Sequence, residues 1–200
     1  MMLNSGNAAG ARTALIQAKL SDYGPNDFAS FLFRVKGVSK DEATKYMIGK
    51  DHFRARVRKS FFEHFRFAGR KLVACMRDLF AKVRDPLDPF DKMLVLEDFS
   101  EEFAKQNELE NRRVLELVAR LYMLNTEIHG RSKAGKLEKV CCEKFASQTN
   151  AGLYGFPKEE LAGMYKDIER HEIRHVISDS ELEHRRLVQH WRIGQAGEDS

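Results

Sequence analysis

The stretch ELENRRVLELVARLYMLNTEIHG, residues 108–130, has the apolar spacing of a long helix. Val114, Leu117, Leu121 and Leu124 recur at intervals of three or four positions, so an α-helix places all four side chains on one face. Charged residues occupy many of the positions between them. The stretch therefore predicts an amphipathic helix that buries one face in a core.

Segments with the same spacing lie on both sides of this helix. In residues 51–69, Phe53, Val57, Phe61 and Phe65 are predicted to face inward. The stretch VRDPLDPF, residues 83–90, holds two of the chain's four prolines and predicts a loop between two helices. Because 200 residues contain only 13 glycines and four prolines, the chain lacks the turns of a β-sandwich and is predicted to be all-α.

The chain is predicted to form one domain, because 200 residues with 42% hydrophobic content allow one sizeable core. Residues 1–12 are expected to be a disordered or tag-like N-terminus, residues 13–194 a single helical domain, and residues 195–200 a frayed tail. No apolar run of about 18 residues and no signal sequence is visible, so a cytoplasmic location is expected.

The charge and the cysteines exclude several classes of function. A net charge of +4 is too small to indicate nucleic-acid binding, and no basic run alternates with aromatic residues. The basic cluster FRARVRK, residues 53–59, is predicted to be a solvated helix face rather than an anion site. Cys75, Cys141 and Cys142 form no disulfide framework and are expected to be buried free thiols.

The stretch HEIRH, residues 171–175, matches the pattern H-E-x-x-H, which on a helix places two zinc ligands beside a general base. It lies at the charged end of a predicted helix, where His171 and His175 would face water. Nothing in the downstream spacing singles out a third ligand. A solvated helix terminus is therefore the favoured interpretation, and neither a metal site nor a zinc protease is expected.

The stretch YMLNTEIHG, residues 122–130, resembles the second signature motif of the Sec7 domain family, usually M-L-N-T-D-L-H-N. Residues 47–80 resemble that family's Y-L-G-x-x-x-x-F segment and the F-x-F-x-G-x-x-L-x-x-A-L-R-x-F-L segment after it. Residues 153–173 are similar to its D-L-P-x-E-x-L-x-x-L-Y-x-x-I-x-x-x-E-I segment, and residues 178–186 resemble the subfamily with a following pleckstrin-homology domain. The resemblance implies a right-handed superhelix of about ten helices that acts as a guanine-nucleotide exchange factor for ADP-ribosylation factor (Arf) GTPases.

The resemblance also implies a site. In that family a loop motif, F-R-L-P-G-E-A-Q, supplies an acidic finger, and the helix ending in the second motif lines an apolar groove for the GTPase switch regions. An ungapped match places residues 83–90 opposite the loop motif, which implies Asp88 as the catalytic finger and Arg84 as a matching loop residue. The implied GTPase-binding residues of the helix are Leu115, Ala119, Tyr122, Met123, Asn125, Thr126 and His129.

Several positions depart from the family pattern. Asp88 replaces the finger glutamate, Leu87 replaces the loop glycine, and Met93, Arg112 and Gly130 replace polar or acidic residues. Asp88 also has the residue type and position of a helix N-cap, and the apolar residues of the groove could simply be core. Two functions therefore stay open: an Arf exchange factor, or a catalytically weak or inactive Sec7-fold scaffold that binds a GTPase, membrane or cytoskeletal partner.

These alternatives differ in what the fold should expose. In an exchange factor, Tyr122 and Met123 are expected to be partly exposed, and Asp88 to lie exposed on the loop with a carboxylate free of partners. Exchange involves no covalent chemistry and no cofactor. The expected partner is an Arf-family small GTPase, without nucleic acid. The protein is expected to be a monomer, recruited to membranes through other domains.

Overall fold

A computed structural model of the chain describes residues 24–34, 40–85, 88–129, 141–148 and 156–174. The predicted terminal segments, residues 1–12 and 195–200, lie outside the described residues. So does Gly130 of the second motif.

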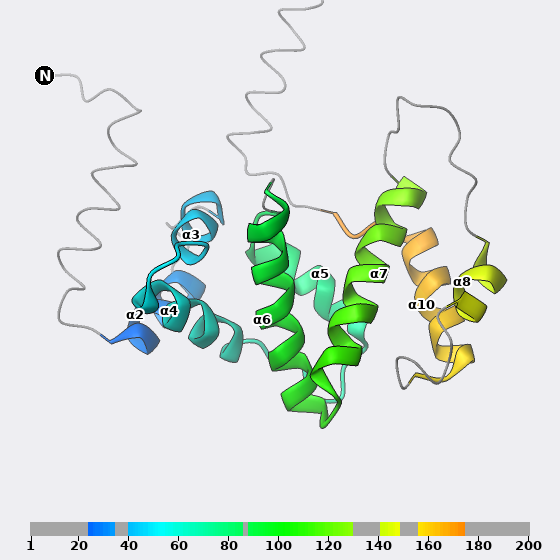
Figure 1. Cartoon of the computed structure of the whole chain (residues 1–200), viewed down its shortest axis with the longest axis horizontal. Coiled ribbons are helices and arrows are strands. Elements are labelled where there is room, and N and C mark those ends of the chain that lie inside the picture. The colour runs from blue at the N-terminus through cyan, green and yellow to red at the C-terminus, as the bar shows by residue number, and fades with distance from the viewer. Residues whose placement is uncertain (1–23, 35–39, 86–87, 130–140, 149–155, 175–200) are drawn as a thin grey trace, which may run out of the picture.

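The described residues form helices and no strand, as the all-α prediction requires. Helices α2, α3 and α4 lie at one end of the molecule, α8 and α10 at the other, and α5, α6 and α7 between them (Figure 1). The eight described helices are α2 (Pro25–Arg34), α3 (Lys40–Met47), α4 (His52–Glu63), α5 (Leu72–Lys82), α6 (Pro89–Asn107), α7 (Asn111–His129), α8 (Cys142–Gln148) and α10 (Lys158–Arg170).

The antiparallel pair α6 and α7 forms the centre of the molecule (Figure 1). Val114, Leu117, Leu121 and Leu124 of α7 are fully buried, which confirms the prediction from their spacing. Glu108 ends α6 in the left-handed conformation and so reverses the chain toward α7. Helix α4 packs on α2, α3 and α6, while α10 packs on α5, α7 and α8, so the central pair connects both ends.

The basic helix α4 was predicted to expose its charged cluster, and for one residue that prediction is wrong. Arg58 is buried, and its guanidinium forms an ion pair with the buried Asp98 of α6 and donates a hydrogen bond of 3.0 Å to the Met47 carbonyl. Burial raises the pKa of the Asp98 carboxyl, and the Arg58 guanidinium opposes that shift. Phe53, predicted to face inward, is instead 40% exposed at the first turn of the helix.

The loop between α4 and α5 is held by two side-chain amides from the end of α6. The Gln106 carbonyl accepts from the Phe67 amide at 2.6 Å, and its NH₂ group donates to the Phe65 carbonyl at 3.0 Å. The Asn107 side chain accepts from the Gly69 amide at 2.9 Å and donates to the Phe67 carbonyl at 3.2 Å. We call this pair of residues the amide clamp. It fixes a loop whose Phe65 and Phe67 rings stack 5.1 Å apart in the core.

Gly163 and Gly69 give a matched prediction for stability. Gly163 lies within α10, and a Cβ added there would meet no atom within 4 Å. Because glycine is a poor helix former, Gly163→Ala is expected to raise the free energy of unfolding by about 0.5–1 kcal/mol. Gly69 has φ +68°, so Gly69→Ala is expected to lower the free energy of unfolding by about 1 kcal/mol. Urea denaturation measures both changes, and equal effects of the two substitutions would contradict this account.

In the part of the chain that the structure describes, no helix combines the length and the apolar character that crossing a membrane requires.

Candidate functional site

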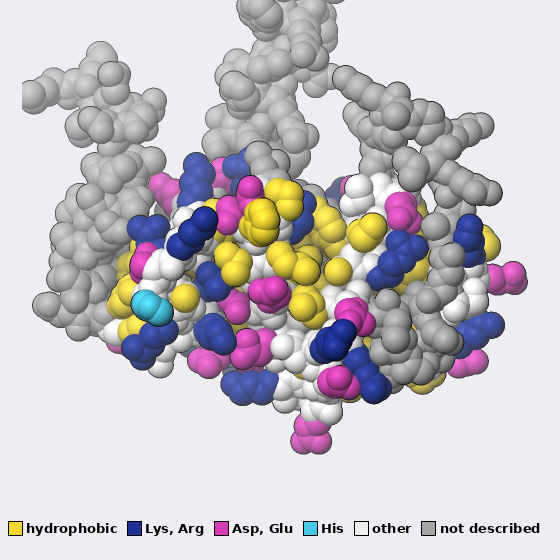
Figure 2. Space-filling model, viewed as in Figure 1, with side chains coloured by type: hydrophobic (Ala, Val, Ile, Leu, Met, Phe, Trp, Pro, Cys, Tyr) yellow, Lys and Arg dark blue, Asp and Glu magenta, His cyan; other side chains and the backbone are white. Residues whose placement is uncertain are grey.

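The outward side of α7 carries a row of partly exposed residues, although the opposite side is buried. Leu115, Ala119 and Tyr122 are half-buried, Thr126 is exposed, and Met123 is 55% exposed. The exposure predicted for Tyr122 and Met123 is therefore found. We call these five residues the α7 stripe. Hydrophobic side chains gather over the neighbouring parts of α6 and α7 (Figure 2).

The hydroxyl of Tyr122 connects the α7 stripe to the loop before α6. It donates a hydrogen bond of 2.7 Å to Asp85 and accepts one of 2.7 Å from the Lys92 ammonium. Lys92 also lies 3.3 Å from the Asp85 carboxylate and 4.7 Å from the centre of the Tyr122 ring. Burial and the bond to Asp85 raise the pKa of the Tyr122 hydroxyl, so it stays a neutral donor. Asp85 and Lys92 were not predicted as site residues, because neither belongs to a recognisable motif position.

Asn125, which the resemblance implies as a GTPase-binding residue, does not lie on the exposed side of α7. Its side chain is buried, and its amide forms two hydrogen bonds with the backbone of Ile173, at 3.2 Å to the carbonyl and 2.8 Å from the amide. Both polar groups of the side chain are therefore engaged within the chain. Asn125 holds the segment after α10 against α7, a structural role that its place in the motif did not reveal.

The other two polar residues of the second motif also form contacts within the chain. The His129 Nε2 lies 2.6 Å from the Ile168 carbonyl of α10, and because a carbonyl oxygen only accepts, Nε2–H is the donor of this hydrogen bond. The Thr126 hydroxyl donates to the Tyr122 carbonyl at 3.2 Å. Thr126 is exposed and remains available to a partner, whereas His129 also serves the contact between α7 and α10.

Arg84 is held beside the loop by two contacts. Its guanidinium lies 2.6 Å from the Asp41 carboxylate of α3, and its backbone amide donates to the Thr44 hydroxyl at 2.9 Å. The side chains of this ion pair are each about one-third exposed, so the contact orients Arg84 more than it stabilises the fold. The loop residue predicted at the site is therefore fixed to α3.

Asp88 lies exposed at the start of α6, as predicted, but its carboxylate is not free of partners. It is the N-cap of α6 and accepts hydrogen bonds from the Phe90 amide at 2.9 Å and the Asp91 amide at 3.2 Å. Pro89 occupies the first turn, where its lack of an N–H costs nothing. The prediction of a free carboxylate is wrong, because the local backbone offers two donors that Asp88 satisfies.

Two substitutions separate the cap from the charge. Asp88→Ala removes the cap and is expected to lower the free energy of unfolding by about 1 kcal/mol. Asp88→Asn removes the charge but keeps a side-chain acceptor, so it is expected to leave the free energy of unfolding within about 0.5 kcal/mol. Urea denaturation of the two variants measures both values. If Asp88→Ala were as stable as the unmodified chain, the cap would have no energetic weight.

The described part of the histidine pattern, residues 171–174, is not helical, because helix α10 ends at Arg170. His171 is exposed, as predicted, while His175 lies outside the described residues. Among the residues that can be placed, no group of three potential ligands gathers. The described residues therefore offer no set of side chains that could hold zinc.

The three cysteines are free, but they are not all buried. Cys75 is buried, as predicted, and its burial raises the pKa of the thiol to about 11. Cys141 is exposed and Cys142 half-buried, so the prediction is wrong for this adjacent pair.

A cavity of about 320 Å³ between α5 and α10 contains none of the predicted site residues. It is lined by Lys71, Val73, Glu159, Glu160, Gly163, Met164 and Asp167. The candidate site is instead the surface formed by the α7 stripe, the start of α6 and the loop before it.

The comparison with protein families matches most of this chain to a known family. The model of the Sec7 domain family matches residues 3–173, which include both the loop before α6 and all of α7. The departures at Asp88 and Met93 therefore lie within a domain that matches the family along most of its length.

Known proteins and structures agree with this match. Cytohesin-3 from Homo sapiens and from Rattus norvegicus is 28% identical over 165 residues, which cover 77% of this chain and 39% of the relative. The chain thus spans about two-fifths of the length of these curated relatives.

Solved structures agree with the family match. The Sec7p catalytic domain superposes with a TM-score of 0.68 at 19% identity, covering 86% of this chain and 99% of that one. A Sec7 domain solved with ARF1-GDP and brefeldin A superposes with a TM-score of 0.66 at 20% identity, covering 84% and 95%. The chain belongs to the Sec7 domain family.

Proposed function

We propose that the protein is a guanine-nucleotide exchange factor for an Arf-family small GTPase. The observation that carries the proposal is the α7 stripe: a family helix whose side facing the loop leaves Met123 and Tyr122 accessible although the helix is otherwise packed. Exposed large apolar side chains beside a loop are typical of binding sites. That one related Sec7 domain was solved with ARF1-GDP supports the choice of partner.

The proposed mechanism is electrostatic and conformational. GDP is held largely by its phosphates and by magnesium, so a carboxylate placed beside the β-phosphate repels the nucleotide. Two unit charges about 4 Å apart at an effective dielectric constant of about 20 interact by about 4 kcal/mol, which corresponds to roughly a thousandfold change in affinity. Binding of the switch regions by the α7 stripe then favours the nucleotide-free conformation. No covalent bond changes.

In this proposal Asp88 supplies the charge, as a finger that first has to leave its cap. The two backbone amides that it accepts from also neutralise part of its charge. Releasing a helix cap costs about 1 kcal/mol, which is small against the electrostatic effect proposed for the carboxylate. Arg84, Leu115, Ala119, Tyr122, Met123 and Thr126 are proposed to contact the GTPase. His129 and Asn125 act indirectly, through the packing of α7.

The second candidate function is a scaffold that binds a GTPase, membrane or cytoskeletal partner without accelerating exchange. The specific observation in its favour is the capping role of Asp88, which explains an aspartate at this position without any role in exchange. Leu87 in place of the motif's glycine also restricts the backbone that would have to present the carboxylate. On either function we propose a monomer in the cytoplasm that other domains bring to membranes.

One experiment separates the two functions. The purified chain is mixed with a panel of Arf GTPases loaded with fluorescent GDP, and nucleotide release is followed, while binding to the nucleotide-free GTPases is measured in parallel. An exchange factor accelerates release from at least one member, and both Asp88→Ala and Asp88→Asn abolish the acceleration. Because Asp88→Asn keeps the cap, its loss of activity would be due to charge. Binding without acceleration would support a scaffold that binds a GTPase. If no member responded in either assay, the exchange function would be overturned, and a scaffold for a membrane or cytoskeletal partner would be the function left.

A further inference from the structure

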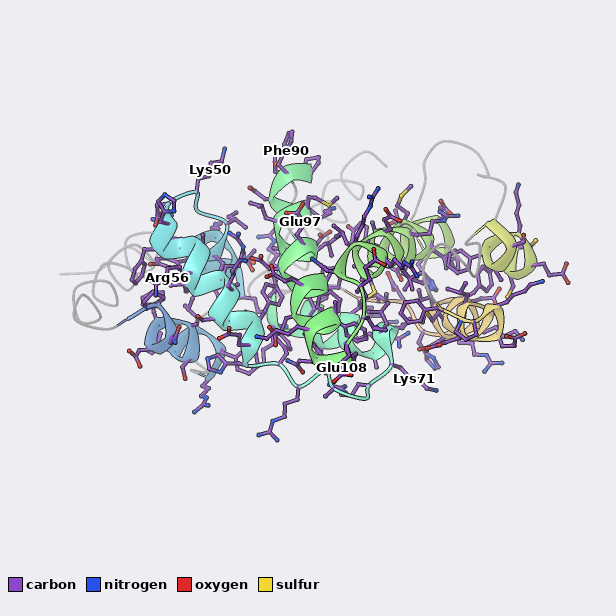
Figure 3. All side chains as sticks on the ribbon, turned by 60° about the horizontal axis from the view of Figure 1, so that its bottom comes forward. Lys50, Arg56, Lys71, Phe90, Glu97 and Glu108 are labelled. Atoms are coloured by element: carbon purple, nitrogen blue, oxygen red, sulfur yellow. The ribbon has the colours of Figure 1, made fainter. Side chains whose placement is uncertain are left out.

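Phe90 is the most exposed of the large hydrophobic side chains in the described residues, at 82%. It lies in the first turn of α6, and its ring points away from the body of the molecule (Figure 3). A phenylalanine side chain carries about 150–250 Å² of apolar surface, and nearly all of it here faces water. Packing within the described part of the chain gives no reason for this residue.

In the free domain the backbone beneath Phe90 is held in place, so the ring is presented before any finger movement of Asp88. The Phe90 amide donates to the Asp88 carboxylate at 2.9 Å. The preceding residue is Pro89, whose ring fixes its backbone φ angle. Only two side-chain torsions remain free, so binding through this ring would lose little conformational entropy. Phe90 is thus a prepared apolar contact rather than a loose end of a loop.

Two further exposed apolar residues lie at the same end of the α6–α7 pair. Met93, 41% exposed, follows Phe90 by one turn, and Met123, 55% exposed, belongs to the α7 stripe. The contact between Lys92 and Tyr122 shows that these turns of α6 and α7 are neighbours. Figure 2 shows the hydrophobic side chains gathered over these parts of the two helices. The apolar surface therefore continues from α7 to the tip of α6.

The charges around Phe90 indicate which partner fits. Asp88 and Asp91 flank the ring in the first turn, and Lys92, the nearest cation along the helix, is engaged by Asp85 and Tyr122. Acidic residues beside an apolar side chain disfavour insertion into an anionic lipid surface. A protein surface with an apolar depression and a basic or neutral rim suits this arrangement better.

We propose that Phe90 is an apolar anchor that binds the GTPase beside its nucleotide site. The proposal rests on the proposed function. Phe90 stands opposite the glutamine that ends the loop motif, and Met93 opposite an acidic residue of the family pattern, so this chain offers apolar contacts where the motif offers polar ones. Part of the binding at the loop is therefore hydrophobic.

The test compares Phe90→Ser with Leu109→Ser in the exchange assay. Leu109 is the control, because it is an apolar residue, 39% exposed, just past the far end of α6, a helix of 19 residues that is about 28 Å long. Phe90→Ser is expected to raise KM for the GTPase by about 10- to 100-fold with kcat changed less than about twofold, since an anchor acts through binding. Leu109→Ser is expected to change neither value, and Phe90→Leu to restore most of the affinity.

The outcomes distinguish this proposal from the proposed function. Exchange by the unmodified chain with an unchanged KM for Phe90→Ser would overturn the anchor alone. A Phe90-dependent dimer in sedimentation, or Phe90-dependent binding to vesicles of phosphatidylcholine and phosphatidylserine, would assign the ring to another partner and also overturn it. If the unmodified chain neither binds nor activates any GTPase of the panel, both proposals fail. Equal thermal stability of Phe90→Ser and Leu109→Ser would exclude unfolding as the cause of a raised KM.

Discussion

Replacing Asp98 by alanine is expected to lower the free energy of unfolding by about 3–5 kcal/mol. The substitution leaves the Arg58 guanidinium buried between α4 and α6 without its carboxylate, and only the Met47 carbonyl remains to accept from it. An uncompensated buried charge is among the most destabilising changes a single substitution can cause. Urea denaturation followed by circular dichroism measures the loss.

The same two helices supply the control. Lys59 of α4 and Glu101 of α6 form an ion pair at 3.1 Å, but both side chains are more than half exposed. Glu101→Ala is therefore expected to cost less than about 1 kcal/mol. A double variant, Arg58→Met with Asp98→Leu, is expected to recover most of the loss, because two apolar side chains of similar size need no pairing. A loss for Asp98→Ala no larger than that for Glu101→Ala would show that the buried pair is not energetically special.

A large expected effect on GTPase binding follows from Met123→Glu. Met123 is 55% exposed in the α7 stripe, so the free domain should accept the change with a loss of less than about 0.5 kcal/mol. In the complex the new carboxylate would lose water against an apolar surface, at a cost of several kcal/mol. We therefore expect kcat/KM for nucleotide exchange to fall at least about 100-fold. The assay is release of fluorescent GDP from the GTPase that responds to the unmodified chain.

Two variants control for position and for size. Leu109→Glu places the same charge on an exposed apolar residue outside the proposed site, and is expected to leave exchange unchanged. Met123→Leu keeps an apolar side chain of similar volume and is expected to retain activity within about threefold. If Met123→Glu exchanged nucleotide at the rate of the unmodified chain, the GTPase would not bind on this side of α7.

Much of the fold follows from apolar periodicity. The buried residues Val114, Leu117, Leu121 and Leu124 were predictable because a helix repeats every 3.6 residues, and that repeat is independent of distant partners. The break at residues 83–90 followed from its prolines. Arg58 was mispredicted, because its partner Asp98 lies 40 positions away and local sequence carries no sign of it. Burial of a charge depends on a tertiary partner, which periodicity does not reveal.

The exposure of the candidate site was predictable from the sequence, but its hydrogen bonds between distant residues were not. The exposure of Tyr122 and Met123 followed from the motif and the helical face together. Asn125 was assigned to the partner, yet its amide serves Ile173, 48 positions away. The contact of Asp85 with Tyr122 spans 37 positions and was missed for the same reason. The hydrogen bonds of Asp88 were predictable, because its capping partners are the next residues in the sequence. Its residue type and position had already indicated a helix N-cap as one alternative.

The amide clamp has a consequence for how this domain can change over evolution. Connecting loops usually accept insertions and deletions, because few contacts depend on their length. Here Gln106 and Asn107 bind successive backbone groups between Phe65 and Gly69, as a neighbouring strand would. Adding or removing one residue would shift every one of these pairings and turn the stacked phenylalanine rings away from the core. Length variation between α4 and α5 should therefore be confined to changes that leave residues 65–69 intact.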